Sequence, residues 1–374
     1  MSTVKILHTG DFHIGSSRTG ISHGKAEIKN TFFRVLDLCK SQSIDFLLIA
    51  GDLFDTPFPD SDTVQEIITA MMQIPDTIIA ISPGNHDCAC PGSVWLKYEF
   101  PENVYVFTGF GEYRVFPEKN VRLYGAAFTD RYERLPLLST FGAVTSDNIN
   151  ICVLHGDLVS ATSDSNYNPI TNEAIKNSGF DYLALGHIHK RSQVERLGNT
   201  NFAYCGCPDG RGFDEEGSCG VYITELSKDK CFASYTEVCS RRYIAESFDV
   251  TGAATSAEIA NNLYEHIEST YPNHQHNLYR INLVGTVNTD FTPNTSQIQS
   301  ALRDRLAYIR VTDRTDTDFS DVERIAKEST LRGMFTERLL EISKSALPEE
   351  TELYREAMKL GLKAFEKEIT LNDN

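Results

Sequence analysis

The stretch ILHTGDFHIG, residues 6–15, is a short apolar run that stops at a glycine and continues into polar residues. We predict a strand over Val4–His8, because an apolar run of this length is typical of a buried strand. Asp11 and His13 follow its end. A helix is predicted next, over Lys25–Lys40, since its apolar residues recur at helical spacing. Strand, polar loop and helix in this order are typical of an α/β fold.

The same pattern recurs along the first half of the chain. Four further apolar runs end beside glycine and metal-competent side chains: Phe46–Ala50 before Gly51-Asp52, Thr77–Ser82 before Gly84-Asn85-His86-Asp87, Asn150–Leu154 before His155-Gly156-Asp157, and Tyr182–Leu185 before Gly186-His187-Ile188-His189. A second helix is predicted over about Ser61–Gln73, capped by Asp60 or Ser61. Strands alternating with helices predict a largely parallel arrangement, and ligands bind at the carboxyl ends of such strands. We therefore expect the five strand ends to form one site.

The polar side chains at these ends are of the kinds that bind divalent cations. The candidate ligands are Asp11, His13, Asp52, Asn85, His155, His187 and His189. They combine oxygen and nitrogen without sulfur, which favours manganese, iron or zinc. The two carboxylate oxygens of Asp52 can bridge two cations. Because paired cations stabilise both the attacking and the leaving oxygen of a phosphoryl displacement, the set predicts a two-metal phosphoesterase.

Residues next to the candidate ligands have predicted roles of their own. We interpret His86 as the acid or transition-state stabiliser at the leaving oxygen, and Asp87 as the residue that orients it. Asp55 is expected to support a ligand by a hydrogen bond. Candidate substrate contacts are Arg18, His23, Lys25 and Arg211. For the first three of these, a solvated loop is an equally good interpretation.

Composition limits the class of protein. The chain has 374 residues, a hydrophobic content of 41% and a net charge of −17, which argues against a general basic coat for nucleic acid. It has no apolar run of about 18 residues and no apolar signal segment at its start, so we expect no membrane span and a cytoplasmic location. The nine cysteines are expected to be free and mostly buried thiols.

The second half of the chain has a different pattern. Strand-like segments between about Val194 and Val238 look antiparallel and are expected to close a second sheet. Strand and helix patterns then alternate again in a small α/β module, and the tail is helical. We predict three domains: residues 1–240 with the site, 241–318 as a smaller capping domain, and 319–374 as a helical tail that could dock a partner.

The five blocks resemble the calcineurin-like metallophosphoesterase superfamily. Three of the motifs resemble those of its DNA-repair nuclease branch, the SbcD and YhaO types: ILHTGDFHIG, LLIAGDLFDTPFPD and SPGNHD. A further segment is similar to the one that follows the last block in the YhaO type: CGCPDGRGFDEEGSCGVYITEL, residues 205–226. The resemblance implies two packed β-sheets flanked by helices, a capping domain, and manganese as the usual metal. It also implies an SbcC-like ABC-type ATPase partner, DNA as substrate, and often a homodimer.

The resemblance also implies how the ligands divide. One metal would be held by Asp11, His13 and His189, and the other by Asn85, His155 and His187. Asp52 would bridge the two, and His86 would be the catalytic histidine. The function expected is a manganese-dependent DNA exo- or endonuclease subunit. Two alternatives stay open: a small-molecule phosphodiesterase with the same ligands, and a scaffold subunit that mainly binds the ATPase.

Overall fold

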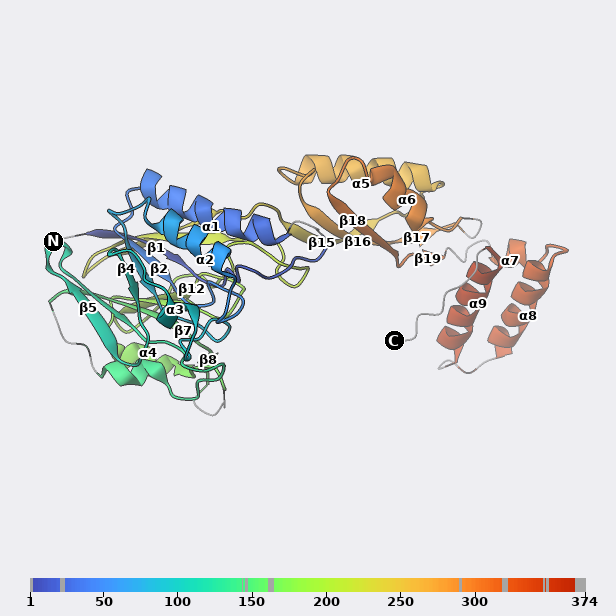
Figure 1. The fold of residues 1–374 in the computed structure, drawn as a ribbon. Helices are drawn as coiled ribbons and strands as arrows, with labels where there is room; N and C mark the ends of the chain where they lie inside the picture. The colour runs from blue at the N-terminus through green and yellow to red at the C-terminus, as the bar shows by residue number, and fades with distance from the viewer. Residues whose placement is uncertain are drawn as a thin grey trace. The chain divides into compact units, whose positions relative to one another are not determined.

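The computed structural model describes residues 3–20, 24–142, 144, 147–160, 165–288, 291–317, 322–345, 347 and 350–366. The chain divides into two compact units, Met1–Tyr243 and Ile244–Asn374. The first unit holds all the predicted metal ligands. Figure 1 shows its strands between flanking helices.

Two six-stranded sheets form the first unit. In the first sheet the order is β14-β13-β1-β2-β3-β4, with β1 (Val4–Thr9), β2 (Phe46–Ile49), β3 (Ile78–Ile81), β4 (Val104–Val106), β13 (Gly220–Leu226) and β14 (Cys231–Glu237). Strands β1 to β4 are parallel. Consequently the loops that leave β1, β2 and β3 all emerge at one edge.

In the second sheet the order is β11-β12-β10-β7-β6-β5, with β5 (Glu112–Phe116), β6 (Val121–Gly125), β7 (Ile149–His155), β10 (Tyr182–Gly186), β11 (Glu195–Leu197) and β12 (Thr200–Tyr204). The four central strands are parallel. The short elements α3 (Val94–Lys97), η1 (Pro117–Lys119), η2 (Leu137–Phe141), β8 (Leu158–Val159) and β9 (Ile170–Thr171) lie in the connections.

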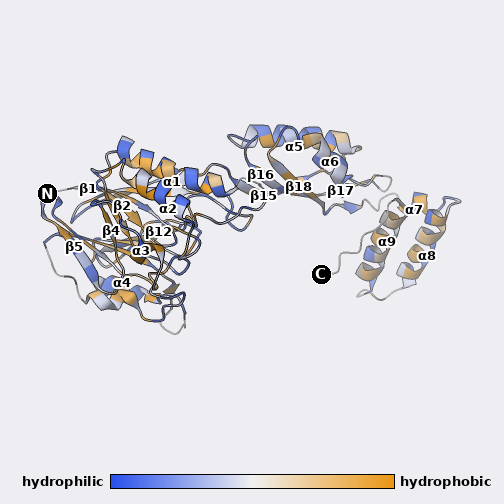
Figure 2. Ribbon diagram, viewed as in Figure 1, coloured by the Kyte–Doolittle hydropathy of each residue, from blue (hydrophilic) through white to orange (hydrophobic). Residues whose placement is uncertain are grey.

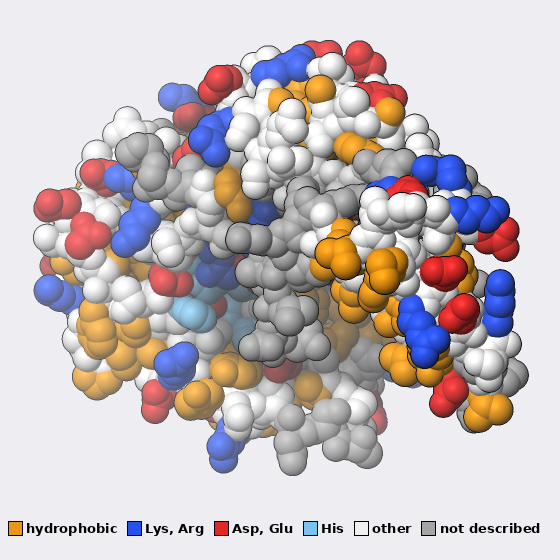
Figure 3. All heavy atoms as spheres, turned by 90° about the vertical axis from the view of Figure 1, so that its right-hand side faces the viewer, with side chains coloured by type: hydrophobic (Ala, Val, Ile, Leu, Met, Phe, Trp, Pro, Cys, Tyr) orange, Lys and Arg blue, Asp and Glu red, His pale blue; other side chains and the backbone are white. Residues whose placement is uncertain are grey.

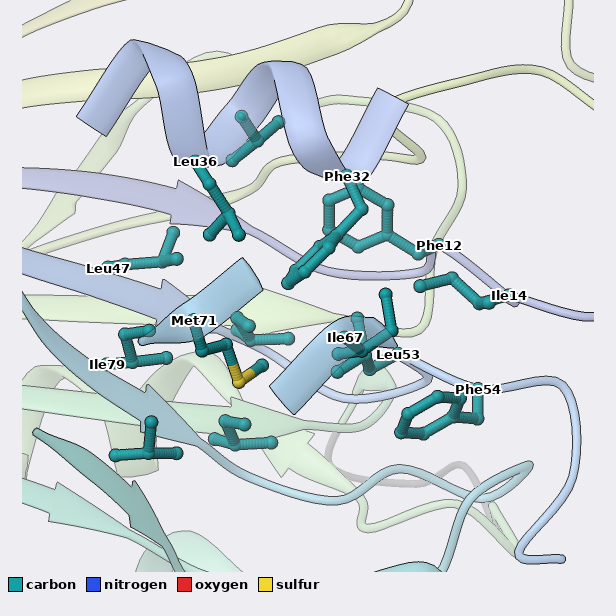
Figure 4. Packing of buried hydrophobic residues seen from close by; sticks show 14 of the residues in the cluster. Phe12, Ile14, Phe32, Leu36, Leu47, Leu53, Phe54, Ile67, Met71 and Ile79 are labelled. Carbon is teal, nitrogen blue, oxygen red and sulfur yellow. The ribbon is translucent and has the colours of Figure 1, made fainter. Parts of the chain in front are cut away.

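Helices cover the outer face of each sheet. On the first sheet, α1 (Gly24–Ser41) and α2 (Ser61–Met71) bury one apolar side each. Figure 4 shows Phe32 and Leu36 of α1 packing with Met71 of α2 above the strand residues Leu47 and Ile79. On the second sheet, α4 (Asn172–Ser178) and η2 pack on a separate apolar cluster. Since the sheets pack face to face within this cover, the predicted two-sheet αββα sandwich is confirmed.

The core between the sheets follows from the alternation of side chains along each strand. On β1, Ile6 points to the second sheet while Leu7 points to the helices. His8 is fully buried and joins the sheets, because it donates from Nε2 to the Leu185 carbonyl oxygen at 3.1 Å and accepts from the Tyr182 hydroxyl, also at 3.1 Å. Its burial lowers the pKa of His8 to about 3, so the ring stays neutral.

The expectation for the region after Val194 is correct in part: β11 pairs antiparallel with β12, and β13 with β14. These strands do not form a single antiparallel group that closes the second sheet. Strand β12 does join that sheet, but parallel to β10, whereas β13 and β14 extend the first sheet through an antiparallel pairing of β13 with β1. The pairing of β1 with β13 joins segments more than 200 residues apart, and local sequence pattern does not encode it.

The second unit begins with a small α/β module. It contains β15 (Tyr243–Asp249), α5 (Ser256–Thr270), β16 (Leu278–Val284), β17 (Thr286–Val287), α6 (Thr295–Leu302), β18 (Tyr308–Asp313) and β19 (Asp316–Thr317). Its main sheet has the order β15-β16-β18, and one apolar cluster lies under α5 and α6. Strands β16 and β17 are separated by Gly285, whose φ of +96° favours glycine. Figure 2 shows both hydrophilic and hydrophobic residues along α5, whose apolar side is buried.

Helices complete the second unit, as the tail pattern predicts. They are α7 (Val322–Ile325), α8 (Leu331–Ser345) and α9 (Thr351–Glu366). A small cluster of four buried residues, Val322, Ile325, Met358 and Leu362, holds them together. None of the helices in the described ranges has both the length and the hydropathy needed to span a bilayer.

Candidate metal centre

The candidate ligands lie at five strand ends, and these ends come from both sheets. Asp11, Asp52 and Asn85 follow β1, β2 and β3 of the first sheet. His155 is the last residue of β7, and His187 directly follows β10 of the second sheet. The sandwich brings these ends together: the backbone N–H of His187 donates to both carboxylate oxygens of Asp11 at 3.1 Å.

The backbone is strained where it presents the ligands. Asp11, His13, Asp52 and His187 have φ values of 50°, 51°, 50° and 100°, in the left-handed region that side-chain-bearing residues rarely adopt. Hydrogen bonds between the loops after β1 and β2 hold this geometry, from the N–H of Asp11 to the Gly51 carbonyl (3.0 Å) and from His13 to the Asp52 carbonyl (2.9 Å). Strain of this kind concentrates at functional sites.

Glycines before the ligands allow the loops to approach. A Cβ atom on Gly51 would lie 2.3 Å from Nδ1 of His155, and one on Gly84 would lie 2.2 Å from Oδ1 of Asp52. A Cβ atom on Gly186 would lie 1.8 Å from the carbonyl oxygen of Ala50. The glycine in each motif is therefore required by close packing around the ligands.

Each of the four histidine ligands has one ring nitrogen occupied on its outer side. Nδ1 of His155 donates to the Ala50 carbonyl oxygen at 2.9 Å, and Nδ1 of His13 donates to Oδ1 of Asp55 at 3.2 Å. Nε2 of His187 donates to Oδ1 of Asp157 at 3.1 Å. Nδ1 of His189 donates to Oε1 of Glu215 at 2.6 Å. In a neutral ring, these bonds leave the inner nitrogen with a free lone pair.

The inner nitrogens form two groups of facing acceptors. The first group consists of Nε2 of His155, Nδ1 of His187 and Oδ1 of Asn85. The two ring nitrogens are 3.2 Å apart, and the Asn85 oxygen lies 2.9 Å from the His155 nitrogen and 3.2 Å from the His187 nitrogen. In the second, Nε2 of His13 and Nε2 of His189 are 3.2 Å apart, with Oδ1 of Asp11 3.9 Å from the latter. Three lone-pair atoms at such distances repel one another unless a cation lies among them.

Asp52 lies between the two groups. Its Oδ2 atom is 3.4 Å from Nε2 of His155 and 3.6 Å from Nε2 of His13, and the Asp52 side chain is almost fully buried. Its Oδ1 atom accepts from the backbone N–H of His86 at 2.9 Å. A carboxylate in this position can contact a cation in either group, which is the arrangement expected of a bridging ligand.

The donors fit a pair of divalent cations. Two imidazole nitrogens that bind the same cation each lie about 2.1 Å from it. When the nitrogen–cation–nitrogen angle is between the octahedral and the tetrahedral value, the two nitrogens are about 3.0–3.4 Å apart. The two histidine pairs meet this condition at 3.2 Å. Burial lowers the pKa of His155, which favours the neutral ring that a metal ligand needs. Three overlapping groups of carboxylate and imidazole donors, which also include Asp55 and His86, lie close enough together to hold an ion.

Glu215 was not anticipated from the sequence. Burial would raise the pKa of the Glu215 carboxyl, but the hydrogen bonds from His189 and Arg211 lower it well below its usual range. It lies 26 residues after His189, in a loop rich in Gly, Asp and Glu, so no local spacing connects the two. Asp157, which holds His187, adjoins a predicted ligand motif but had no assigned role.

His86 and Asp87 have different surroundings. The His86 side chain is 39% exposed beside the ligands, with its ring 4.6 Å from that of His13 and its Nδ1 atom 3.4 Å from the Asp55 carbonyl oxygen. The carboxylate of Asp87 instead accepts from the backbone N–H groups of Gly84, Asp52 and Phe54 at 2.8–3.2 Å. It therefore orders the loops that carry the ligands, and Asp55 rather than Asp87 lies against the His86 ring.

The candidate substrate contacts are not equivalent. Arg18 is buried, and its guanidinium pairs with Glu27 and with Asp209, which gives it a structural role instead of an open surface for a substrate. Lys25 is exposed in the first turn of α1. His23 lies outside the described residues. Arg211 borders the site, 2.9 Å from Oε1 of Glu215 and 3.9 Å from Oδ1 of Asp55.

Comparison with known families identifies the domain. Residues 4–191 match the family model described as calcineurin-like phosphoesterase. The chain belongs to this family. The match includes every one of the seven candidate ligands, from Asp11 to His189. This assignment makes the chain a metal-dependent phosphoester hydrolase by family.

The relatives of this calcineurin-like phosphoesterase confirm the resemblance to the YhaO and SbcD types. The uncharacterized metallophosphoesterase YhaO of Bacillus subtilis is 27% identical over 285 residues, 72% of this chain and 68% of the relative. The DNA double-strand break repair protein Mre11 of Saccharolobus solfataricus is 24% identical over 236 residues, 60% of this chain and 61% of the relative. The SbcD subunit of the SbcCD nuclease of Escherichia coli is 26% identical over 285 residues, 61% of this chain and 66% of the relative.

These matches cover only about two thirds of each relative's length. Among solved structures, that of TT1561 from Thermus thermophilus is similar with a TM-score of 0.40 and 12% identity, covering 63% of this chain and 100% of that chain.

Proposed function

We propose that this phosphoesterase is a nuclease that hydrolyses DNA phosphodiesters with two divalent cations, of which manganese is the expected one. The observation that carries the proposal is the pair of facing acceptor groups around Asp52, each with its histidines fixed from behind. Divalent cations held there would polarise a phosphoryl oxygen and acidify water. One group would be His13, His189 and Asp11, and the other His155, His187 and Asn85.

The chain's own residues prepare this site before any substrate arrives. Asp55, Asp157 and Glu215 each hold one histidine in a single tautomer, so no ring has to turn when the substrate binds. The exposed ring of His86 has its Nδ1 atom beside the Asp55 carbonyl oxygen. Its Nε2 atom is then the one that can meet the leaving oxygen of a phosphodiester.

DNA as the substrate is supported by the names of the relatives, two of which are a DNA double-strand break repair protein and part of a nuclease. The net charge of −17 favours a smaller diester instead. On the face of the molecule drawn in Figure 3, basic and acidic side chains of described residues are interspersed. Attraction of DNA would therefore depend on the cations and on local contacts more than on a broad basic surface.

The remaining expectations belong to the same proposal. An SbcC-like ABC-type ATPase partner, homodimer formation and a cytoplasmic location stay predictions. So does the division into a catalytic domain (1–240), a capping domain (241–318) and a partner-binding tail (319–374). Helices α8 and α9 leave the large apolar residues Leu331, Met334, Leu353, Leu360 and Phe365 exposed, which supports a docking role for the tail.

The direct test uses the full chain with manganese and three substrates: linear duplex DNA, single-stranded DNA and the small diester bis(p-nitrophenyl) phosphate. We expect cleavage of DNA, and a loss of at least about a hundredfold in kcat for His86→Ala with both metals still bound. The matched control is His276→Ala, in the second unit. If the small diester is cleaved and DNA is left intact, the nuclease proposal is wrong. Metals bound without any cleavage would favour the scaffold alternative.

A further inference from the structure

A cavity of about 570 Å³ opens beside the metal centre. His189 and Glu215, which belong to the metal centre, form one part of its wall. Lys190, Arg191 and Tyr235 form another. Its volume is within the range of about 300–1,000 Å³ that is usual for small-ligand sites. Because it shares a wall with the centre, a group bound in it would be adjacent to a phosphodiester held by the ligands.

Two cations border this cavity directly after the metal ligand in the sequence. Lys190 and Arg191 are both exposed, and neither forms an ion pair with a carboxylate among the residues that the structure describes. The guanidinium carbon of Arg191 lies 4.0 Å from the centre of the Tyr235 ring, so cation–π stacking limits the orientations of the Arg191 guanidinium group. A planar guanidinium that is held in place and lacks a carboxylate partner is suited to bind a phosphate through two hydrogen bonds.

The rim of the same cavity also has acidic side chains. Asp214 and Glu216 line the cavity and are exposed, and Glu215 between them pairs with His189 and Arg211. A purely anionic ligand such as free phosphate would meet repulsion from this rim. A ligand with an anionic group and a hydrogen-bond-donating group would suit both the basic and the acidic side chains. A nucleotide has this chemistry, because its phosphate accepts and the amino groups of its base donate to carboxylates.

We propose that this cavity is the subsite for the nucleotide that flanks the scissile phosphodiester. Arg191 and Lys190 bind the phosphate of that nucleotide, and its base lies toward the carboxylate of Asp214. The inference rests on the proposed nuclease function and extends it, since it assigns residues that distinguish a polynucleotide from a small diester. The metal ligands contact only the reacting phosphate, so they cannot make this distinction.

The test compares Arg191→Ala and Lys190→Ala with Arg196→Ala, which removes an exposed arginine that does not line the cavity. The substrates are a single-stranded oligonucleotide and bis(p-nitrophenyl) phosphate. We expect KM for the oligonucleotide to rise by about tenfold to a hundredfold in Arg191→Ala, the usual effect of losing a charged hydrogen bond, and to rise less for the small diester. The Arg196→Ala variant should match the wild type on both.

A second readout does not depend on turnover. Fluorescence anisotropy of a labelled oligonucleotide, measured with EDTA present, should give a weaker Kd for Arg191→Ala and for Lys190→Ala than for Arg196→Ala. An equal change of KM on both substrates, or an unchanged Kd for the oligonucleotide, would overturn the subsite. A different result would show that the nuclease function itself is wrong: wild-type protein would then cleave the small diester but no DNA.

Discussion

The carboxylate of Glu215 lies 2.6 Å from Nδ1 of His189, on the side of the ring that faces away from the other metal ligands. This bond fixes the tautomer of His189 and increases the basicity of its inner nitrogen. It also brings the loop that contains Glu215 into contact with the metal centre, although the family match ends at residue 191. The centre therefore depends on residues beyond the matched domain.

The first prediction concerns this bond. In Glu215→Gln, the affinity for the cation at the His189 position should fall by about tenfold to a hundredfold, because the amide cannot replace the charge of the carboxylate. Isothermal titration with manganese measures the effect. Glu225→Gln is the matched control, since Glu225 is exposed on β13. Equal affinities for the two variants would exclude Glu215 from the support of the ligand.

The second prediction concerns Asp52. Its Oδ2 atom is close to a histidine of each group, so Asp52→Ala should lower metal content at both positions rather than at one. Elemental analysis of the purified protein gives the number of ions per chain. Asp76→Ala, at an exposed carboxylate, should keep the wild-type content. Full metal content in Asp52→Ala would refute the bridging role.

The third prediction concerns the glycine of the last motif. In Gly186→Ala the new methyl group would overlap the Ala50 carbonyl oxygen, which also accepts the hydrogen bond from His155. We expect a loss of about 1–3 kcal/mol in the free energy of unfolding, the usual cost of overpacking. Urea unfolding measures it. Gly109→Ala is the control, because its methyl group would meet only Oε1 of the Glu112 side chain, at 3.2 Å, and no backbone atom within 4 Å. Equal stability of the two variants would contradict the packing argument.

The fourth prediction is a pH dependence. Burial opposes ionisation of Glu27, but hydrogen bonds and charges from Arg241 and Arg18 lower the pKa of Glu27 below its ordinary value of 4.5. A depressed folded-state pKa contributes stability above 4.5, and this contribution is lost as the pH falls through the folded-state value. Glu27→Gln should therefore lower the unfolding temperature at pH 7, and the difference from wild type should shrink at acidic pH. A difference that does not vary with pH would contradict this account, and Glu99→Gln, at an exposed site, should show no such effect.

The sequence predicted the ligand-bearing strand ends because each one has a local signature. An apolar run, a glycine and a metal-competent side chain occur within a few residues, and the close contacts of Gly51 and Gly186 explain why glycine is needed. The helices were equally local: the helix predicted at Lys25–Lys40 is α1, which spans Gly24–Ser41. Asp60 caps α2 by accepting from the N–H of Thr63 at 2.8 Å.

Features that depend on distant parts of the chain were not predictable in this way. The position of β13 beside β1, the bond from His189 to Glu215 and the burial of Arg18 all require the folded chain. Arg18 lies in a polar loop and looks available to a substrate, yet its partner Asp209 is almost 200 residues away. The candidate metal ligands thus have local sequence signatures, while the groups that support them do not.

The origin of the ligands in two sheets has a consequence for biosynthesis. A ribosome that has released only the first three strands has released Asp11, Asp52 and Asn85, but the chain still lacks all the ligands of the second sheet. The contact between Asp11 and His187 closes over 176 residues, and closing a loop of this length costs conformational entropy that slows folding. A partly made chain therefore cannot assemble the centre. Only a closed sandwich brings the candidate ligands of both sheets to one phosphoester.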